Sequence, residues 1–175
     1  MKYSILIILT FFLSAGEIKN TCEEHLFNLY PKNRDIRMHI FQLDKQIKNK
    51  VENIVKQRFY KDKLYYWTIT EGDSTKAYAF LDNVIGKSMP ITFMVILNID
   101  GEIENVNVIK YREAYGSEVG SKSWLQQFIN FNNNSDYNIG KDIDGISGAT
   151  ISVKSISKGM KKITTLYPLI QSQLK

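Results

Sequence analysis

The chain has 175 residues, of which 43% are hydrophobic, and its 23 Lys and Arg against 18 Asp and Glu give a net charge of +5. This length and apolar content suffice for one compact domain, so a fully disordered chain is excluded. The single cysteine, Cys22, excludes a disulfide framework, and His25 and His39 have no neighbours at metal-ligand spacing. The charge excess is too small, without a basic motif, to indicate nucleic-acid binding.

The first sixteen residues have the pattern of a secretory signal peptide. Lys2 precedes an apolar or weakly polar run from Tyr3 to Leu13, and the small residues Ser14 to Gly16 follow. The run is shorter than the ~20 residues that span a bilayer as a helix. We therefore expect cleavage after Gly16 and an exported mature chain, periplasmic or at the cell surface. An uncleaved membrane anchor is the alternative.

Apolar residues from Ile36 to Phe59 recur at helical spacing and predict a long amphipathic helix near the start of the mature chain. Between Lys32 and Lys63 there are ten Lys or Arg and four Asp or Glu, a net charge of +6. A solvated helix face is the simplest interpretation of these charges. Attraction to anionic lipid headgroups or to an acidic partner is the other.

The middle of the chain is rich in aromatic and β-branched residues, which are typical of strands. Asp100-Gly101 predicts the tight turn of a hairpin, and imperfect alternation after it predicts a bulge near Glu104-Asn105. The polar stretch from Asn130 to Asn138 predicts a loop. The expected strands are residues 64–70, 77–81, 91–99 and 103–111.

Together these elements predict an α+β fold, an antiparallel sheet packed by helices on one side. We divide the chain into the signal peptide at 1–16, an N-terminal helix and strands at 17–83, and a core at 84–175.

A turn of small residues, Asp-Gly-Ile-Ser-Gly-Ala-Thr at 144–150, leads into an apolar helical stripe from Ile156 to Ile170. Thr150 or Ser152 can cap this helix. A helix N-terminus with accessible N–H groups also favours a phosphate, so an anion site and an ordinary capped helix start both fit. The lysines expected on the surface of this helix are Lys154, Lys158, Lys161 and Lys162.

Three further segments are informative: residues 86–93, 111–119 and 124–128. They predict a loop entering a strand, a polar loop leaving the next strand, and a short helix. Their aromatics Tyr111, Tyr115 and Trp124 suit either a planar ligand or the core, and packing is the commoner role.

The 144–150 motif resembles the flavinylation motif of the FMN-binding domain family, which includes the C subunit of the sodium-pumping NADH:quinone reductase and the G subunit of the Rnf complex. Within the three segments above, residues 86–92, 111–118 and 124–128 resemble the small soluble members of that family in the same order. The resemblance covers about residues 84–165.

The resemblance implies a covalent FMN cofactor. The matching threonine, Thr150, would carry FMN through a phosphoester that a flavin transferase of the ApbE type installs outside the cytoplasm. The loop after the second hairpin strand would lie beside the flavin. The implied cofactor-binding residues are Asp144, Gly145, Ser147, Gly148, Ala149, Thr150, Glu113, Tyr115, Gly116 and Glu118.

The function implied is electron transfer by an exported flavoprotein, at the outer face of the cytoplasmic membrane and between membrane or extracytoplasmic redox partners. No catalytic acid–base pair is visible in the sequence, so a carrier is expected rather than a stand-alone enzyme. The alternatives are a non-redox exported binding module that keeps the fold, or the flavin-carrying partner of an extracellular reductase.

Overall fold

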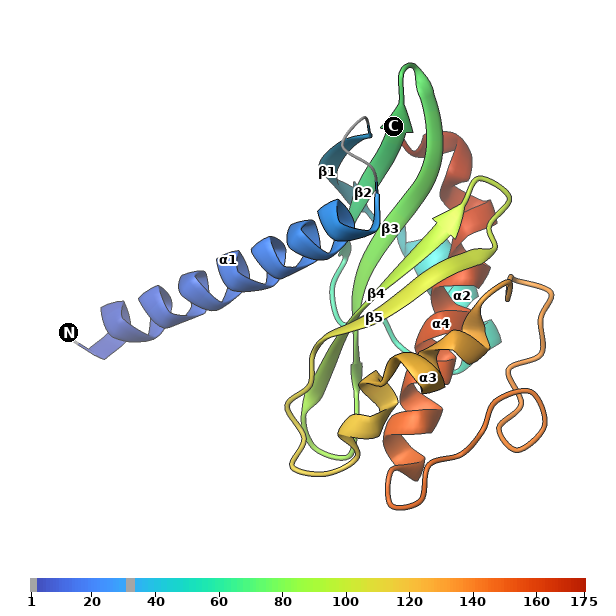
Figure 1. Ribbon diagram of the computed structural model, residues 1–175. Coiled ribbons are helices and arrows are strands. Elements are labelled where there is room, and N and C mark those ends of the chain that lie inside the picture. The colour runs from blue at the N-terminus through green and yellow to red at the C-terminus, as the bar shows by residue number, and fades with distance from the viewer. Residues whose placement is uncertain (1–2, 31–33) are drawn as a thin grey trace.

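The computed structural model describes residues 3–30 and 34–175, with residues 3–15 described by their backbone alone. Lys2 and Lys32, which entered the sequence predictions, lie outside the described residues. The fold is α+β, as expected, around a five-stranded antiparallel sheet in which each strand pairs with the next along the chain (Figure 1). The strands are β1 (Asp35–Gln42), β2 (Lys63–Glu71), β3 (Ser74–Ile85), β4 (Pro90–Asn98) and β5 (Ile103–Lys110).

The helices are α1 (Tyr3–Leu29), α2 (Lys45–Val55), α3 (Lys122–Leu125) and α4 (Thr150–Ile170), with 3-10 turns at Ser117–Gly120, Gln126–Phe128 and Gln171–Gln173. The expected division at residue 84 lies within β3, so residues on both sides of it share one sheet.

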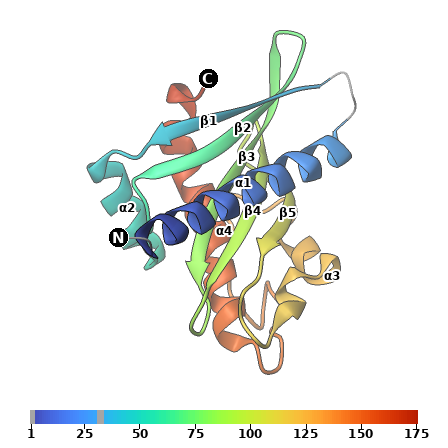
Figure 2. The ribbon, with the colours of Figure 1, turned by 90° about the vertical axis from the view of Figure 1, so that its left-hand side faces the viewer.

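Helices cover both faces of the sheet, so the prediction of helices on one side was wrong. Helices α2 and α4 pack on one face, and α1 crosses the opposite face (Figure 2). The larger core lies under α4, where the predicted stripe from Ile156 to Ile170 is buried. That stripe is confirmed, but Lys162 is buried and not on the surface, because its Nζ lies 2.8 Å from Asp82 Oδ2 at the sheet.

The smaller core explains why α1 docks on the sheet. Cys22 and Leu26 are fully buried against sheet residues that include Trp67 and Met94. Burying a side chain such as that of Leu26 contributes about 1.5–3 kcal/mol. Burial also raises the pKa of the Cys22 thiol to about 12, with a smaller contribution from Glu23, so this cysteine is a packing residue.

Polar contacts fix the position of α1 along β5. The two ring nitrogens of His25 lie 3.3 Å from Asn105 Oδ1 and 3.1 Å from Asn107 Nδ2. Lys110 Nζ donates to Glu17 Oε2 over 3.1 Å. Helix α1 continues without a break across the expected cleavage position at Gly16. Among the helices of the described residues, none is long and apolar enough to cross a membrane.

The predicted long helix from Ile36 to Phe59 was also wrong. Its first part is strand β1, paired along its whole length with β2, and only Lys45–Val55 is helical. Asp44 separates the two, because its carboxylate accepts the backbone N–H groups of Gln46 and Ile47 and begins the helix there.

The hairpin of β4 and β5 is confirmed. Gly101 has a φ of +84°, a left-handed conformation that favours glycine. The bulge falls at Glu104, since Ile96 pairs with Asn105 whereas Leu97 pairs with Ile103. The expected loop at 130–138 contains no helix or strand.

Candidate functional site

The start of α4 forms one wall of a pocket of about 520 Å³. The other walls are the turn between β3 and β4 and the loop that follows β5. The volume lies in the range of about 300–1,000 Å³ that is usual for cofactor and small-molecule sites. The pocket is lined by Lys87, Ser88, Glu113, Ala114, Tyr115, Gly148, Ala149, Thr150, Ile151 and Ser152.

Sheet topology brings these segments together. In an antiparallel meander, the end of β3, the start of β4 and the end of β5 all lie at one end of the sheet. Glu113 then joins the two loops, because its Oε1 accepts the backbone N–H groups of Ser88 at 2.7 Å and Met89 at 2.9 Å. The Met89 and Ser88 N–H groups lower the pKa of the Glu113 carboxyl below its usual value. Glu113 is therefore ionised at neutral pH and holds the turn in place.

The same loop is fastened to α4. The Tyr111 hydroxyl donates to the backbone oxygen of Tyr115, and it lies 3.3 Å from Ser152 Oγ. Gly116 has a φ of +83°, and a Cβ at this position would lie 2.8 Å from the Cβ of Ala149. Glycine is required here because of its left-handed backbone and because of this close approach.

Tyr115 itself points away from the protein body, with 86% of its surface exposed. Its ring also lines the pocket and is therefore accessible to a ligand bound there. Trp124 is buried, and its Nε1 donates to the backbone oxygen of Asp144 over 2.8 Å. Of these two aromatics, Tyr115 is the one available to a planar ligand, and Trp124 anchors the motif.

The first turn of α4 has no side-chain cap. Its N-cap residue is Ala149, which has no acceptor to offer, and Thr150 is the first helical residue. The prediction that Thr150 or Ser152 caps this helix was therefore wrong. The unpaired N–H groups of a helix start carry a partial positive charge, and this one faces a pocket that also includes Lys87. The arrangement suits a phosphate group.

Two hydroxyls of the motif, and that of Ser152 just after it, differ in access. Thr150 is exposed and lines the pocket. Ser152 is 5% exposed and its oxygen faces Tyr111. Ser147 is exposed but is not part of the pocket wall. Thr150 is thus the only one of the three that combines exposure with a place in the pocket.

The sequence-predicted site residues divide into two groups. Five line the pocket, and the other five lie behind or beside it: Glu113, Tyr115, Gly148, Ala149 and Thr150 in the first group, and Asp144, Gly145, Ser147, Gly116 and Glu118 in the second.

Asp144 is held by the helical segment after β5 through the Trp124 contact and a 2.7 Å hydrogen bond from its N–H to Gln127 Oε1. The residues that sequence reasoning left out of the site are Lys87, Ser88, Ala114, Ile151 and Ser152. The expected hairpin of residues 91–99 and 103–111 contained a signal for Lys87 and Ser88, because it puts the residues before its first strand beside the loop that follows its second strand.

Comparison with known families agrees with this geometry. Residues 86–165 match the model of the FMN-binding domain family, a segment that begins directly after β3 and includes every wall of the pocket. The match covers slightly less than half of the chain, and it supports an FMN-binding domain and a flavin-binding protein. A search of curated proteins found no match.

Proposed function

We propose that this protein is an exported flavoprotein that carries FMN through a phosphoester to Thr150 and transfers electrons at the outer face of the cytoplasmic membrane. One observation carries the proposal: an exposed threonine hydroxyl stands at the uncapped start of a long helix, in a pocket of cofactor size within the segment that matches the FMN-binding domain.

The residues at the start of α4 fit the phosphate of FMN. A phosphodiester on Thr150 keeps one negative charge next to N–H groups that have no side-chain acceptor. Lys87, on the wall formed by the turn between β3 and β4, supplies a positive charge. Such a helix-start interaction is worth roughly 0.3–1 kcal/mol.

Residues of the loop after β5 would hold the rest of the cofactor. Tyr115 offers an exposed ring for contact with the isoalloxazine, and Glu113 keeps the two loops at a fixed separation. When bound, the flavin supplies the capacity to accept and release electrons, and the protein contacts tune its potential.

Attachment needs a partner enzyme, which we propose is a flavin transferase of the ApbE type. The Thr150 oxygen attacks the FMN phosphorus of FAD, the bond to the AMP phosphate breaks, AMP leaves, and the hydroxyl proton goes to a base of the transferase. A Cβ at Gly148, whose φ is +78°, would have no neighbouring atom within 4 Å, so the chain beside Thr150 is open to an approaching transferase.

Mass spectrometry tests the attachment. The protein co-expressed with such a transferase should gain the mass of FMN less one water on Thr150 and show flavin fluorescence after denaturation. Thr150→Ala should abolish the adduct, and the matched control Ser147→Ala, at the other exposed hydroxyl, should keep it. An adduct that persists in Thr150→Ala, or maps to Ser147 or Ser152, would overturn the assignment.

Export is tested separately, on protein from its native source. We expect its N-terminus at or near Glu17, after removal of residues 1–16. Recovery of Met1 on a membrane-bound form would contradict cleavage and favour an anchor.

A further inference from the structure

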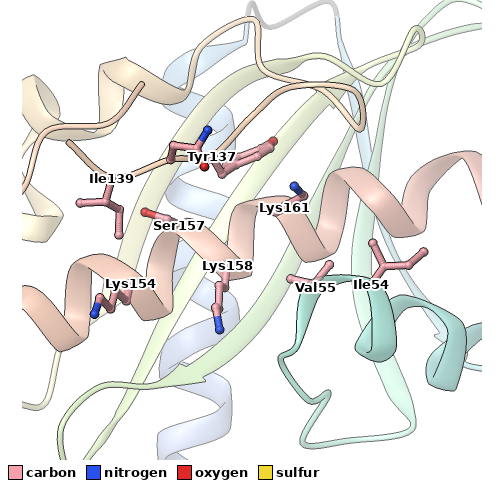
Figure 3. Close-up of a pocket in the computed structure, with 9 residues that line it drawn as sticks. Ile54, Val55, Tyr137, Ile139, Lys154, Ser157, Lys158 and Lys161 are labelled. Carbon is pink, nitrogen blue, oxygen red and sulfur yellow. The ribbon is translucent and has the colours of Figure 1, made fainter. Parts of the chain in front are cut away.

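A second recess, of about 220 Å³, lies on the α2 and α4 face of the molecule. Its walls are the middle of α4, the end of α2 and the loop at residues 137–139 (Figure 3). It shares no residue with the Thr150 pocket. The lining residues are Ile54, Val55, Tyr137, Asn138, Ile139, Lys154, Ser157, Lys158 and Lys161.

Apolar residues lie at the two ends of this recess, Ile139 at one end and Ile54 and Val55 at the other (Figure 3). Ile54 is 53% exposed and Ile139 is 37% exposed, with Val55 buried beside Ile54. The hydroxyls in the wall are already used: Ser157 Oγ donates to the Val153 oxygen at 2.8 Å, and the Tyr137 hydroxyl lies 3.0 Å from Thr164 Oγ1. A ligand here meets apolar side chains at both ends of the recess, and both wall hydroxyls already have partners.

The rim is positively charged. Lys154, Lys158 and Lys161 lie at helical spacing along α4, and none of them forms an ion pair in the part of the chain that the structure describes. On the facing loop, Asp142 Oδ2 accepts the Asn138 backbone N–H. Three neighbouring cations without carboxylates repel one another, so an acidic partner is favoured here.

The shape of the site argues against a small ligand. The volume is below the roughly 300–1,000 Å³ of typical small-molecule pockets. The ammonium groups also do not converge: Lys161 reaches toward Tyr137, with its Nζ 5.7 Å from the ring centre, whereas Lys154 and Lys158 extend to the other side of α4 (Figure 3). A free phosphate is held by converging donors, which this arrangement lacks.

Exposed apolar side chains beside unpaired charges suit a protein–protein interface, which combines apolar contacts with charged residues at its edge. A flat lipid surface matches this arrangement less well, because the apolar residues lie in a recess between α2, α4 and the 137–139 loop. We propose that this recess docks an acidic segment of a partner protein, with one aliphatic or aromatic side chain in the recess and carboxylates at Lys154, Lys158 and Lys161.

The position of the recess connects it to the first site. At 1.5 Å per residue along α4, the lysines lie about 6–17 Å from Thr150. A partner docked here sits beside the proposed flavin. The identification of this partner as the electron donor or acceptor rests on the proposed function. The docking itself does not depend on that function.

The docking is therefore tested first on protein without flavin. The probe is a short synthetic peptide rich in Asp and Glu around one Leu, titrated into the isotope-labelled protein at low salt and followed by NMR. We expect shift changes concentrated at Ile54, Val55, residues 137–139 and residues 154–161. The combined variant Lys154→Gln, Lys158→Gln and Lys161→Gln should weaken binding about tenfold.

The matched control removes three exposed lysines elsewhere: Lys45→Gln, Lys63→Gln and Lys122→Gln, with the same change in net charge. It should bind nearly as tightly as the parent, and Ile54→Ser should weaken binding without changing the charge. Equal loss in both triple variants, or no shifts at the recess, would overturn the proposal. Tighter binding of inorganic phosphate or of phosphatidylglycerol vesicles than of the peptide would also overturn it. A failed flavin attachment changes none of these outcomes.

Discussion

Helices α2 and α4 pack together on the same face of the sheet, but their first turns are completed differently. At the start of α2, the Asp44 carboxylate accepts the N–H groups of Gln46 at 2.7 Å and Ile47 at 3.2 Å. At the start of α4, Ala149 occupies the equivalent position and no side chain accepts these N–H groups. An aspartate thus completes the first turn of the shorter helix, whereas the first turn of the longer helix has no side-chain acceptor and lies within the segment that matches the FMN-binding domain.

The largest expected loss of stability comes from adding a side chain where the loop after β5 packs against the start of α4. Gly116→Ala puts a Cβ 2.8 Å from the Cβ of Ala149 on a left-handed backbone, and should cost about 2–4 kcal/mol of the free energy of unfolding. Urea denaturation measures this. Gly140→Ala is the control, because Gly140 also has a positive φ, of +87°, but open space around it. Equal losses in the two variants would mean that the approach to Ala149 is not tight.

The next largest effect concerns the capped helix. Asp44→Ala removes the acceptor of two N–H groups and should lower the free energy of unfolding by about 0.5–2 kcal/mol. Asp44→Asn keeps an acceptor and should recover most of this loss. If Asp44→Ala is as stable as the parent protein, water satisfies the N–H groups at the start of α2 as well as the carboxylate does. The presence or absence of a cap would then not distinguish α2 from α4.

Local patterns in the sequence predicted some parts of the fold and missed others. The buried stripe of α4, the Asp100-Gly101 turn and the bulge at Glu104 follow from local patterns, and the structure confirms all three. Strand β1 was missed because Ile36, Ile40 and Leu43 fit helical spacing, and pairing with β2 is not visible in a local pattern.

Helix α1 on the second face was missed for the same reason. Cys22 and Leu26 become core residues only because Trp67, Met94 and their neighbours present an apolar surface to them. Of the site, the motif at 144–150 and the loop with Glu113 and Tyr115 were predictable from resemblance. The absence of a cap at Ala149 was not, since Thr150 and Ser152 are both residues that commonly cap helices.

A smaller effect is expected at Glu113, and it should depend on pH. The Ser88 and Met89 N–H groups lower the pKa of this carboxyl in the folded protein. Its stabilising contribution is therefore complete above the ordinary pKa of a glutamate, about 4.3, and is lost as the pH falls through the lowered value. Glu113→Gln should be less stable than the parent at neutral pH, and the two should converge in acid. A difference that does not change with pH would mean that the charge of Glu113 contributes nothing.

The smallest effect on the free energy of unfolding is expected at Thr150, the first residue of α4. Without flavin, Thr150→Ala should unfold within about 0.5 kcal/mol of the parent, because the hydroxyl makes no capping hydrogen bond and alanine favours helices. With flavin attached, the parent should gain roughly 0.3–1 kcal/mol over its unloaded form, as the phosphate takes the place that Asp44 holds in α2. Urea midpoints at constant slope separate the three proteins. A loss in unloaded Thr150→Ala as large as that of Asp44→Ala would mean that Thr150 is itself the cap, and that the start of α4 is not open to a phosphate.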